Sequence, residues 1–296
     1  MSETYVSSPA DENAIASAIR HYAVEQLIAV GAHLTQPGTE PHVGIHEARK
    51  AIRRFRAVLP LCGGASEIAV DALDRAARRL GKSLSTLRDA HVVVQVAARR
   101  LKGNSPQGGR DLWRSLRDTL VLRRDALTHT AFVADAEFMR RRTAAAGLQK
   151  RFAALEWTAF TPEAILLALR RSSARVRRAE HNAKQRPTLA LKHRWRRRAR
   201  RLRMQLQCIA ELAHQRNPAS KEAQLQARWV WREAMETMPS IDTLNTLVTA
   251  LGVHRDTKML RDAVLLEKDL AGQDVLLEVL LKKLGKNKLP AKAGNF

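Results

Sequence analysis

One pattern of residues occurs twice in this chain, in segments separated by about half its length. The pattern is H-x-x-R-[KR]-x-x-R-R-[FL]-R, and it covers residues 46–56 and 193–203. Because a helix turns by about 100° per residue, the histidine and the cations three, four and seven positions later lie on one side, opposite the apolar residues. The chain is therefore predicted to be an internal duplication built around two helices, each with a cationic front and an apolar back.

The two cationic fronts are more strongly charged than a solvated helix face requires. Like charges four positions apart on a helix repel each other, and no acidic residue occurs between Glu180 and Glu211, the stretch that contains the second front. Such a surface is costly unless an anion neutralises it, so we interpret both fronts as parts of an anion-binding surface. Their residues are His46, Arg49, Lys50 and Arg53 in the first copy and His193, Arg196, Arg197 and Arg200 in the second.

A second pair of matching segments follows the cationic helices. Residues 84–89 and 251–256 share the frame L-[SG]-x-x-R-D. An Arg-Asp dipeptide alone has no diagnostic value, but its recurrence in both halves supports the duplication. Arg88 and Arg255 are predicted to extend the anion-binding surface, and Asp89 and Asp256 are predicted to position side chains by local pairing.

Composition narrows the class of partner. The chain has 296 residues and is 45% hydrophobic, which suits one large or two modest globular domains. Its formal net charge of +23, from 52 Lys and Arg against 29 Asp and Glu, exceeds what solubility requires and indicates a polyanionic partner. Nucleic acid, polyphosphate and an anionic membrane surface are the candidates.

The cysteines and the N-terminus indicate the compartment. Cys62 and Cys208 are the only cysteines, so there is neither a disulfide framework nor a CxxC metal site. Residues 1–13 lack the features of a signal peptide, and no apolar run approaches the roughly 20 residues that span a bilayer. We expect a cytoplasmic protein without a membrane span.

Apolar residues recur at helical spacing almost throughout, which predicts an all-α fold. Residues 1–11 and the lysine-rich tail 286–296 are predicted to be disordered, and the structured region 12–284 to consist of repeats at 12–147 and 160–284. A flexible loop is predicted at 102–109, and Thr161 and Ser240 are predicted to cap helices. The predicted helices are 12–34, 42–61, 66–101, 109–128, 132–146, 161–183, 188–215, 219–237, 240–251 and 255–284, the last broken near Gly272.

Together these motifs resemble a CHAD domain, the helical domain named for its conserved histidines, over about residues 11–283. The resemblance implies two four-helix bundles related by a pseudo-twofold axis, with the histidine helices facing a central basic cavity or pore. It also implies binding of inorganic polyphosphate, often at polyphosphate granules. Many relatives carry a triphosphate-tunnel enzyme domain with an E-x-E-x-K strand, and this chain has no such motif. We therefore expect no catalysis and no cofactor.

Arginine suits polyphosphate because its planar guanidinium can bond two oxygens at once, whereas lysine supplies a point charge. Among many cations the two front histidines should be neutral in the free protein and protonated beside phosphate, so affinity is predicted to rise as the pH falls through about 6.5. The residues predicted to bind polyphosphate are His46, Arg49, Lys50, Arg53, Arg54, Arg56, Lys82, Arg88, His193, Arg196, Arg197, Arg200, Arg201, Arg203 and Arg255.

Three other functions remain open. Nucleic-acid binding is the main rival, because any polycation binds phosphates weakly, but the aromatic content of 4% leaves few stacking platforms. An enzyme is less favoured, since no H-E-x-x-H, P-loop or D-x-D motif occurs. A granule scaffold that uses polyphosphate only as an anchor, with granule proteins as partners, would need the same cationic helices.

Overall fold

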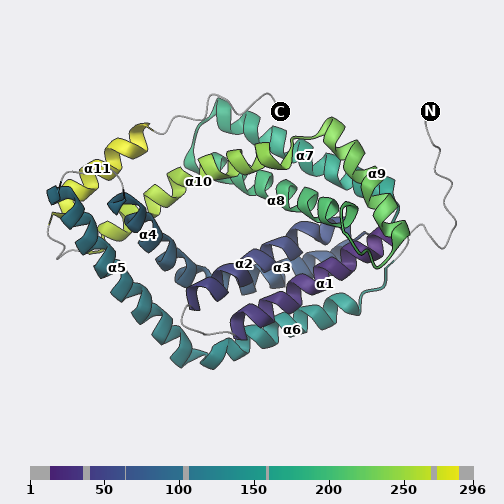
Figure 1. Ribbon diagram of the computed structural model, residues 1–296, viewed down its shortest axis with the longest axis horizontal. Coiled ribbons are helices and arrows are strands. Elements are labelled where there is room, and N and C mark those ends of the chain that lie inside the picture. The colour runs from purple at the N-terminus through teal and green to yellow at the C-terminus, as the bar shows by residue number, and fades with distance from the viewer. Residues whose placement is uncertain are drawn as a thin grey trace.

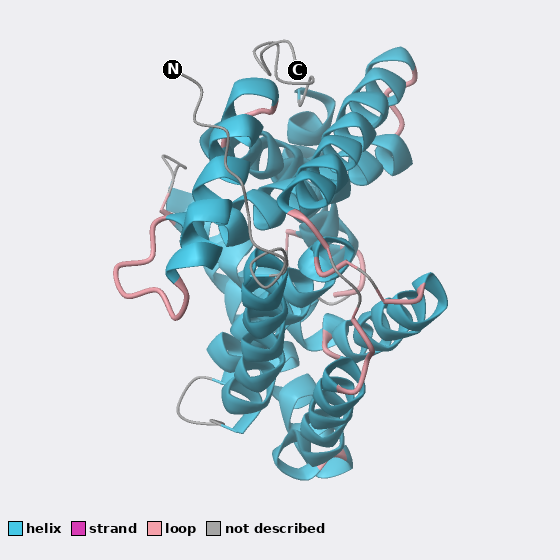
Figure 2. Cartoon of the chain, turned by 90° about the vertical axis from the view of Figure 1, so that its right-hand side faces the viewer, coloured by secondary structure: helices cyan, strands magenta, loops and turns pink. Residues whose placement is uncertain are grey.

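The computed structural model describes residues 14–35, 41–63, 65–102, 107–157, 160–267 and 272–286. All regular secondary structure within those ranges is helical (Figure 2), which confirms the all-α prediction. Two short 3-10 helices, η1 (Leu59–Leu61) and η2 (Ala136–Phe138), accompany the α-helices. These are α1 (Ala14–Thr35), α2 (Pro41–Val58), α3 (Glu67–Ser83), α4 (Ser85–Leu101), α5 (Gln107–Ala134), α6 (Met139–Ala153), α7 (Pro162–Gln185), α8 (Leu189–Ala213), α9 (Lys221–Thr237), α10 (Ile241–Val264) and α11 (Gln273–Lys286).

Several helix ends follow from local chemistry. The side chains of Thr161 and Ser240 accept hydrogen bonds from the backbone N–H groups of Ala164 and Thr243, so both predicted N-caps are confirmed. Gly272 has a φ of 71° just before α11, which places a break where the sequence predicted one. The predicted disordered segment 1–11, residues 103–106 of the predicted loop 102–109 and residues 287–296 of the predicted tail lie outside the described residues. The loop prediction is wrong for residues 107–109, which begin α5, and the tail prediction is wrong for Lys286, which ends α11.

Three helix boundaries differ from the prediction. The predicted break between 128 and 132 is absent, because α5 continues to Ala134 and α6 begins only at Met139. The predicted helix 66–101 is two helices, α3 and α4, which meet at Leu84. Conversely, α10 continues through Gly252, where the sequence predicted a break. Glycine ordinarily weakens a helix, but a Cβ at this position would lie 2.9 Å from Nη2 of Arg196. Gly252 therefore leaves space for a guanidinium that reaches α10 from α8.

The helices pack in three groups. In the first group, α1 and α3 each pack on α2 and on α6. In the second group, α8 packs on α7, α9 and α10, and α7 also packs on α9. In the third group, α4 packs on α5, and α10 packs on both α4 and α11. In Figure 1 these groups surround the middle of the molecule, with α2 and α8 on two sides of it. The predicted division into two four-helix bundles stays a prediction, because α1 packs on α9, α2 packs on α8, and the main hydrophobic core is continuous across both halves.

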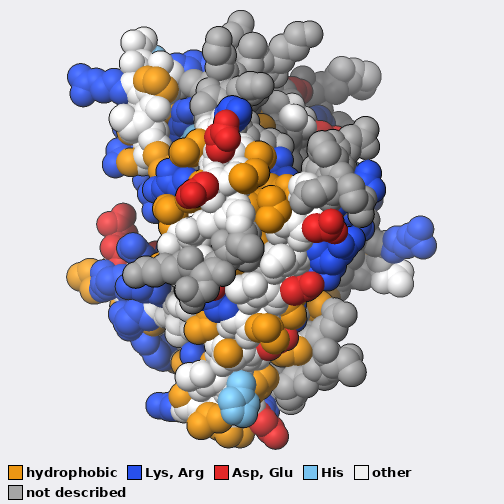
Figure 3. Space-filling model, turned by 90° about the vertical axis from the view of Figure 1, so that its left-hand side faces the viewer, with side chains coloured by type: hydrophobic (Ala, Val, Ile, Leu, Met, Phe, Trp, Pro, Cys, Tyr) orange, Lys and Arg blue, Asp and Glu red, His pale blue; other side chains and the backbone are white. Residues whose placement is uncertain are grey.

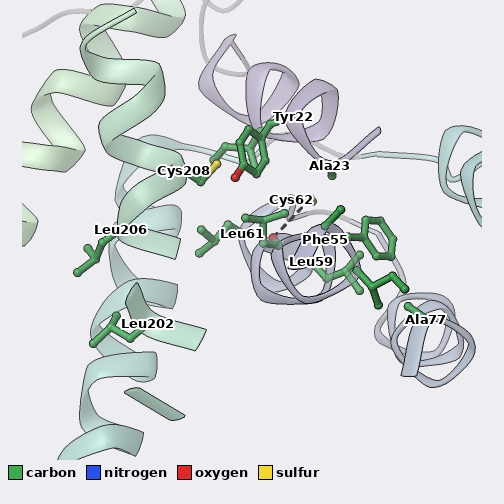
Figure 4. Close-up of a cluster of buried hydrophobic side chains, with 14 of the residues drawn as sticks. Tyr22, Ala23, Phe55, Leu59, Leu61, Cys62, Ala77, Leu202, Leu206 and Cys208 are labelled. Carbon is green, nitrogen blue, oxygen red and sulfur yellow. Dashed lines mark hydrogen bonds between the residues drawn. The ribbon is translucent and has the colours of Figure 1, made fainter. Parts of the chain in front are cut away.

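The predicted apolar backs of the two cationic helices form part of this core. Figure 4 shows side chains of α2, η1 and α8, together with Tyr22 of α1 and Ala77 of α3, in one buried cluster. Phe55 packs edge-on against Phe152 of α6, with ring centroids 5.4 Å apart. All the predicted back residues are at most 2% exposed, namely Ala48, Ile52, Phe55, Leu59, Trp195, Ala199, Leu202, Leu206 and Ile209.

Candidate anion-binding site

A cavity of about 480 Å³ lies between α2, α3 and α8. We call it the α2–α8 cavity. Ala57 and Met204 contribute its apolar lining, and no acidic side chain lines it. Its remaining lining residues are Arg53, Arg56, Arg78, Arg194, Arg197, Arg198, Arg200 and Arg201.

A second cavity of about 430 Å³, the α8–α10 cavity, lies on another side of α8. It shares Arg194, Arg197 and Arg200 with the first cavity, so α8 presents one band of cations to both. No acidic side chain lines this cavity either. Its further lining residues are Ala190, His193, Arg196 and Arg255.

The acid-free linings differ from the surface formed by α5 and α11. Figure 3 shows that side of the molecule, where acidic side chains lie among hydrophobic ones. The arginines of α5 have carboxylate partners there: Arg114 contacts Asp111 at 2.5 Å, and Arg123 contacts Glu267 at 2.8 Å. The positive charge is therefore not a uniform coat, and in the linings of the two cavities no carboxylate balances it.

The centre of the site is electrostatically unfavourable without a ligand. Burial, followed by the charges of Arg49, Arg88, Arg196 and Arg203, lowers the pKa of Arg53 to about 10. A guanidinium that is buried among like charges gains free energy when an anion enters. We call this group the central arginine cluster. It consists of Arg49, Arg53, Arg88, Arg196, Arg203 and Arg255.

Two members of the central arginine cluster tie helices together. Nη1 of Arg49 donates to the carbonyl oxygen of Gly81 and, at 2.8 Å, to Oγ of Ser85. Nε of Arg196 donates to the carbonyl oxygen of Val248 at 3.0 Å. Each arginine thus links its cationic helix to the segment just before an Arg-Asp element, which is the α3–α4 junction for Arg49 and the interior of α10 for Arg196. Part of the hydrogen-bonding capacity of both arginines is therefore used within the fold.

The Arg-Asp elements pair across the molecule and not locally. Nη2 of Arg255 donates to Oδ1 of Asp89 at 3.2 Å, although the two residues are 166 positions apart. Asp256 in turn lies close enough to Arg88 to favour its charged form. The predicted local pairing of these carboxylates is wrong for Asp89, because the packing of α4 on α10 brings the opposite arginine to it.

Asp74 of α3 is the acidic side chain that links the two cationic helices. Its carboxylate accepts two hydrogen bonds from Arg56 of α2, both of 2.9 Å, and lies 3.7 Å from Nη2 of Arg201 of α8. A bidentate pair of this kind fixes the guanidinium plane. Arg56 and Arg201 therefore line the α2–α8 cavity in positions that Asp74 holds.

The remaining predicted residues line neither cavity. Lys50 pairs with Glu47 at 3.0 Å, and Arg203 donates to Asn245 at 2.6 Å. Arg54 lies beside Glu211, where it opposes the rise that burial causes in the pKa of that carboxyl. The predicted residues that line neither cavity are His46, Arg49, Lys50, Arg54, Lys82, Arg88 and Arg203.

Sequence reasoning missed three arginines that line the cavities. Arg194 and Arg198 lie in the acid-free stretch around the second pattern, and that stretch was the signal that could have identified them. Arg78 of α3 belongs to neither repeated pattern, so no feature of the sequence distinguished it. The site is also less symmetric than the repeat, because α8 contributes more of the lining than α2.

The histidines near the site favour their neutral forms. Burial, followed by the nearby Arg88, lowers the pKa of His46, and burial followed by Arg255 lowers that of His193. A phosphate beside either ring would raise its pKa again. Proton uptake by either ring on anion binding is therefore expected at pH values above its lowered pKa in the free protein.

His91 of α4 is expected to destabilise the free protein in acid. Burial and then Arg88, His42, Arg124 and His46 lower its pKa from 6.5 to about 4, and its ring stacks on that of His42 at 5.0 Å. Between pH 6.5 and about 4 the unfolded chain therefore binds more protons at His91 than the folded protein does. The free energy of unfolding should decrease as the pH falls through this interval.

Urea unfolding at several pH values tests this expectation. His91→Gln should flatten the decrease, whereas His181→Gln, at an exposed position of α7, should leave it unchanged. Equal slopes for wild type and His91→Gln would contradict it.

Comparison with known proteins agrees with this architecture. The chain is an all-helical domain, in its described residues, with an arginine-lined cavity between two cationic helices. The CHAD domain family model matches residues 21–265, and the chain belongs to the CHAD family. A solved relative is the CHAD domain from the plant Ricinus communis, which is 17% identical, with a TM-score of 0.55 over 94% of this chain and 89% of that one.

A comparison with curated proteins finds no significant match to this chain. None of the described helices is long and apolar enough to cross a membrane. Cys62 and Cys208 are both buried and free, and the described part of the chain contains no group of three or more His, Cys, Asp or Glu residues suited to a metal ion.

Proposed function

We propose that this protein binds inorganic polyphosphate, without catalysis, through the arginines that line the α2–α8 and α8–α10 cavities. The observation that carries the proposal is the α2–α8 cavity, which is lined by eight arginines and by no acidic residue. Polyphosphate is a linear anion without bases, so charge, hydrogen-bond donors and cavity width suffice to recognise it. The CHAD family is linked to polyphosphate binding in general, which favours this ligand.

The arrangement of the arginines favours polyphosphate over nucleic acid. Duplex DNA is read by elements that protrude into its grooves, whereas the arginines of α8 line cavities between packed helices. Single strands are bound largely by stacking on aromatic side chains, and neither cavity has a Phe, Tyr or Trp in its lining. Weak, salt-dependent binding of nucleic acid to the exposed arginines is compatible with this proposal.

Within the site, the proposed roles differ by residue. Arg53, Arg197 and Arg200 are the proposed direct ligands, because they line the cavities and no hydrogen bond or ion pair within the described residues engages them. Arg56 and Arg201 would contact phosphate while Asp74 orients them. Arg49, Arg196 and Arg255 are proposed to contribute charge from helix-linking positions, and His193 to add a proton-dependent contact at the α8–α10 cavity. Association with polyphosphate granules in the cytoplasm belongs to the same proposal.

Competition binding tests this function. Labelled long-chain polyphosphate is displaced with unlabelled polyphosphate or duplex DNA at equal phosphate concentration and physiological salt. DNA should compete at least about tenfold more weakly, because its binding would depend on non-specific phosphate contacts at the surface. Equal competition by DNA would show that the protein is a general polyanion binder and would support the nucleic-acid alternative.

A further inference from the structure

A third cavity, outside the site described above, lies between α3, the end of α5 and α6. This α3–α6 cavity has a volume of about 590 Å³ and shares no lining residue with the other two. Its lining includes four arginines and one carboxylate, that of Asp135. The arginines are Arg79 of α3 and Arg140, Arg141 and Arg151 of α6.

The single carboxylate does not neutralise these arginines. Asp135 is 6% exposed, and its Oδ2 lies 2.6 Å from Nη1 of Arg141 while its Oδ1 accepts a hydrogen bond from the backbone of Arg140. Arg79 and Arg151 have neither an ion pair nor a hydrogen bond within the part of the chain that the structure describes. Two exposed guanidiniums therefore remain available to an anion at this cavity.

The turn between Asp135 and α6 has an unusual backbone conformation. Glu137 and Phe138 have φ values of 48° and 54°, in the left-handed region that non-glycine residues rarely adopt. This turn places the Phe138 ring 5.1 Å from the guanidinium carbon of Arg141 and stacks it on Phe132. The opposite wall is open, because a Cβ at Gly147 would meet no atom within 4 Å.

Helix α3 joins this cavity to the α2–α8 cavity. Arg75, Arg78, Arg79 and Lys82 follow one another at helical spacing, and all four are exposed. Arg78 lines the α2–α8 cavity, and its neighbour Arg79 lines the α3–α6 cavity. At 1.5 Å per residue the row is about 10 Å long, so a flexible linear anion in one cavity meets positive charge on its path towards the other.

We propose that the α3–α6 cavity is a second subsite for polyphosphate, occupied by the part of a long chain that leaves the α2–α8 cavity across the basic row of α3. This inference rests on the proposed function and extends it to chain length. Because two subsites on one ligand act with a high effective concentration, affinity increases once a chain is long enough to reach both. Tripolyphosphate occupies one cavity only and gains nothing from the second.

The test compares tripolyphosphate with long-chain polyphosphate by isothermal titration calorimetry. Arg79→Gln/Arg151→Gln is expected to weaken long-chain binding at least about tenfold and to leave tripolyphosphate binding unchanged. Gly147→Leu should have the same effect, because it fills the cavity without changing any charge. The matched control is Arg171→Gln/Arg232→Gln, which removes the same charge from exposed positions of α7 and α9 that line none of the three cavities.

Three outcomes would overturn the second subsite. The first is that the control pair loses as much affinity for long-chain polyphosphate as the cavity variants do. The second is that the cavity variants lose affinity for long-chain polyphosphate and for tripolyphosphate equally. The third is that the ratio of these two affinities in the cavity variants equals the wild-type ratio. Failure of the proposed function gives a different result, since wild-type protein would then bind tripolyphosphate no more tightly than the Arg53→Gln/Arg200→Gln variant. A melting temperature for Gly147→Leu equal to that of wild type verifies that this variant is folded.

Discussion

Arg53→Gln/Arg200→Gln is expected to weaken binding of long-chain polyphosphate by at least about 100-fold. In the proposed site each arginine donates a charge-assisted hydrogen bond to phosphate. Loss of such a bond costs roughly 1.5–3 kcal/mol of binding free energy. The two residues come from the two cationic helices and line the same cavity. Calorimetric titration at physiological salt measures the loss.

The same substitutions should not lower the free energy of unfolding. Burial, followed by the like charges around it, lowers the pKa of Arg53 to about 10, so its positive charge opposes folding in the absence of an anion. Loss of binding with unchanged or increased stability is therefore the signature of a ligand-binding arginine. The control pair Arg171→Gln/Arg232→Gln should reduce affinity by a much smaller factor. Comparable losses in both double variants would mean that the net charge of +23 is responsible rather than the cavity.

Phe55→Ala is expected to lower the free energy of unfolding by about 3–5 kcal/mol, as large-to-small substitutions of buried aromatic residues do. Phe55 is fully buried on the apolar back of α2 and packs edge-on against Phe152. Its loss would leave a cavity between α2 and α6, in the core that also holds α8 in place (Figure 4). Chemical denaturation monitored by circular dichroism gives the value.

A conservative variant provides the comparison for Phe55. Phe55→Leu introduces the residue that stands at the matching position of the second pattern, Leu202, and should cost much less because most of the buried apolar surface remains. Equal destabilisation by Ala and Leu would mean that the aromatic contact with Phe152, and not the filling of the core, determines the stability at this position.

Local features of the fold were predictable from the sequence, and long-range features were not. The N-caps at Thr161 and Ser240 and the break at Gly272 follow from side-chain and backbone preferences that act within a few residues. The break at Leu84 was missed because the apolar period continues through it. The helix through Gly252 was missed because the reason for that glycine is Arg196, a residue of another helix.

The candidate site divides in the same way. The repeated pattern identified Arg53, Arg56, Arg197, Arg200 and Arg201, all of which line the α2–α8 cavity. The pattern treated the two helices as equivalent. It therefore did not predict that α8 contributes more residues to the cavity lining than α2 does. It also gave no reason to select Arg78 of α3, because that residue is distinguished only by its position beside the cavity.

The sequence by itself determined that this protein has two helices with a cationic front and an apolar back, because helical periodicity is a local property that residue spacing expresses directly. Only the tertiary structure decided which of those charges meet in one cavity and which are paired within the fold. The contacts of Arg255 with Asp89 and of Arg201 with Asp74 join residues far apart in the chain. Such contacts depend on how the helices pack, and the spacing of charges along one helix does not determine that packing.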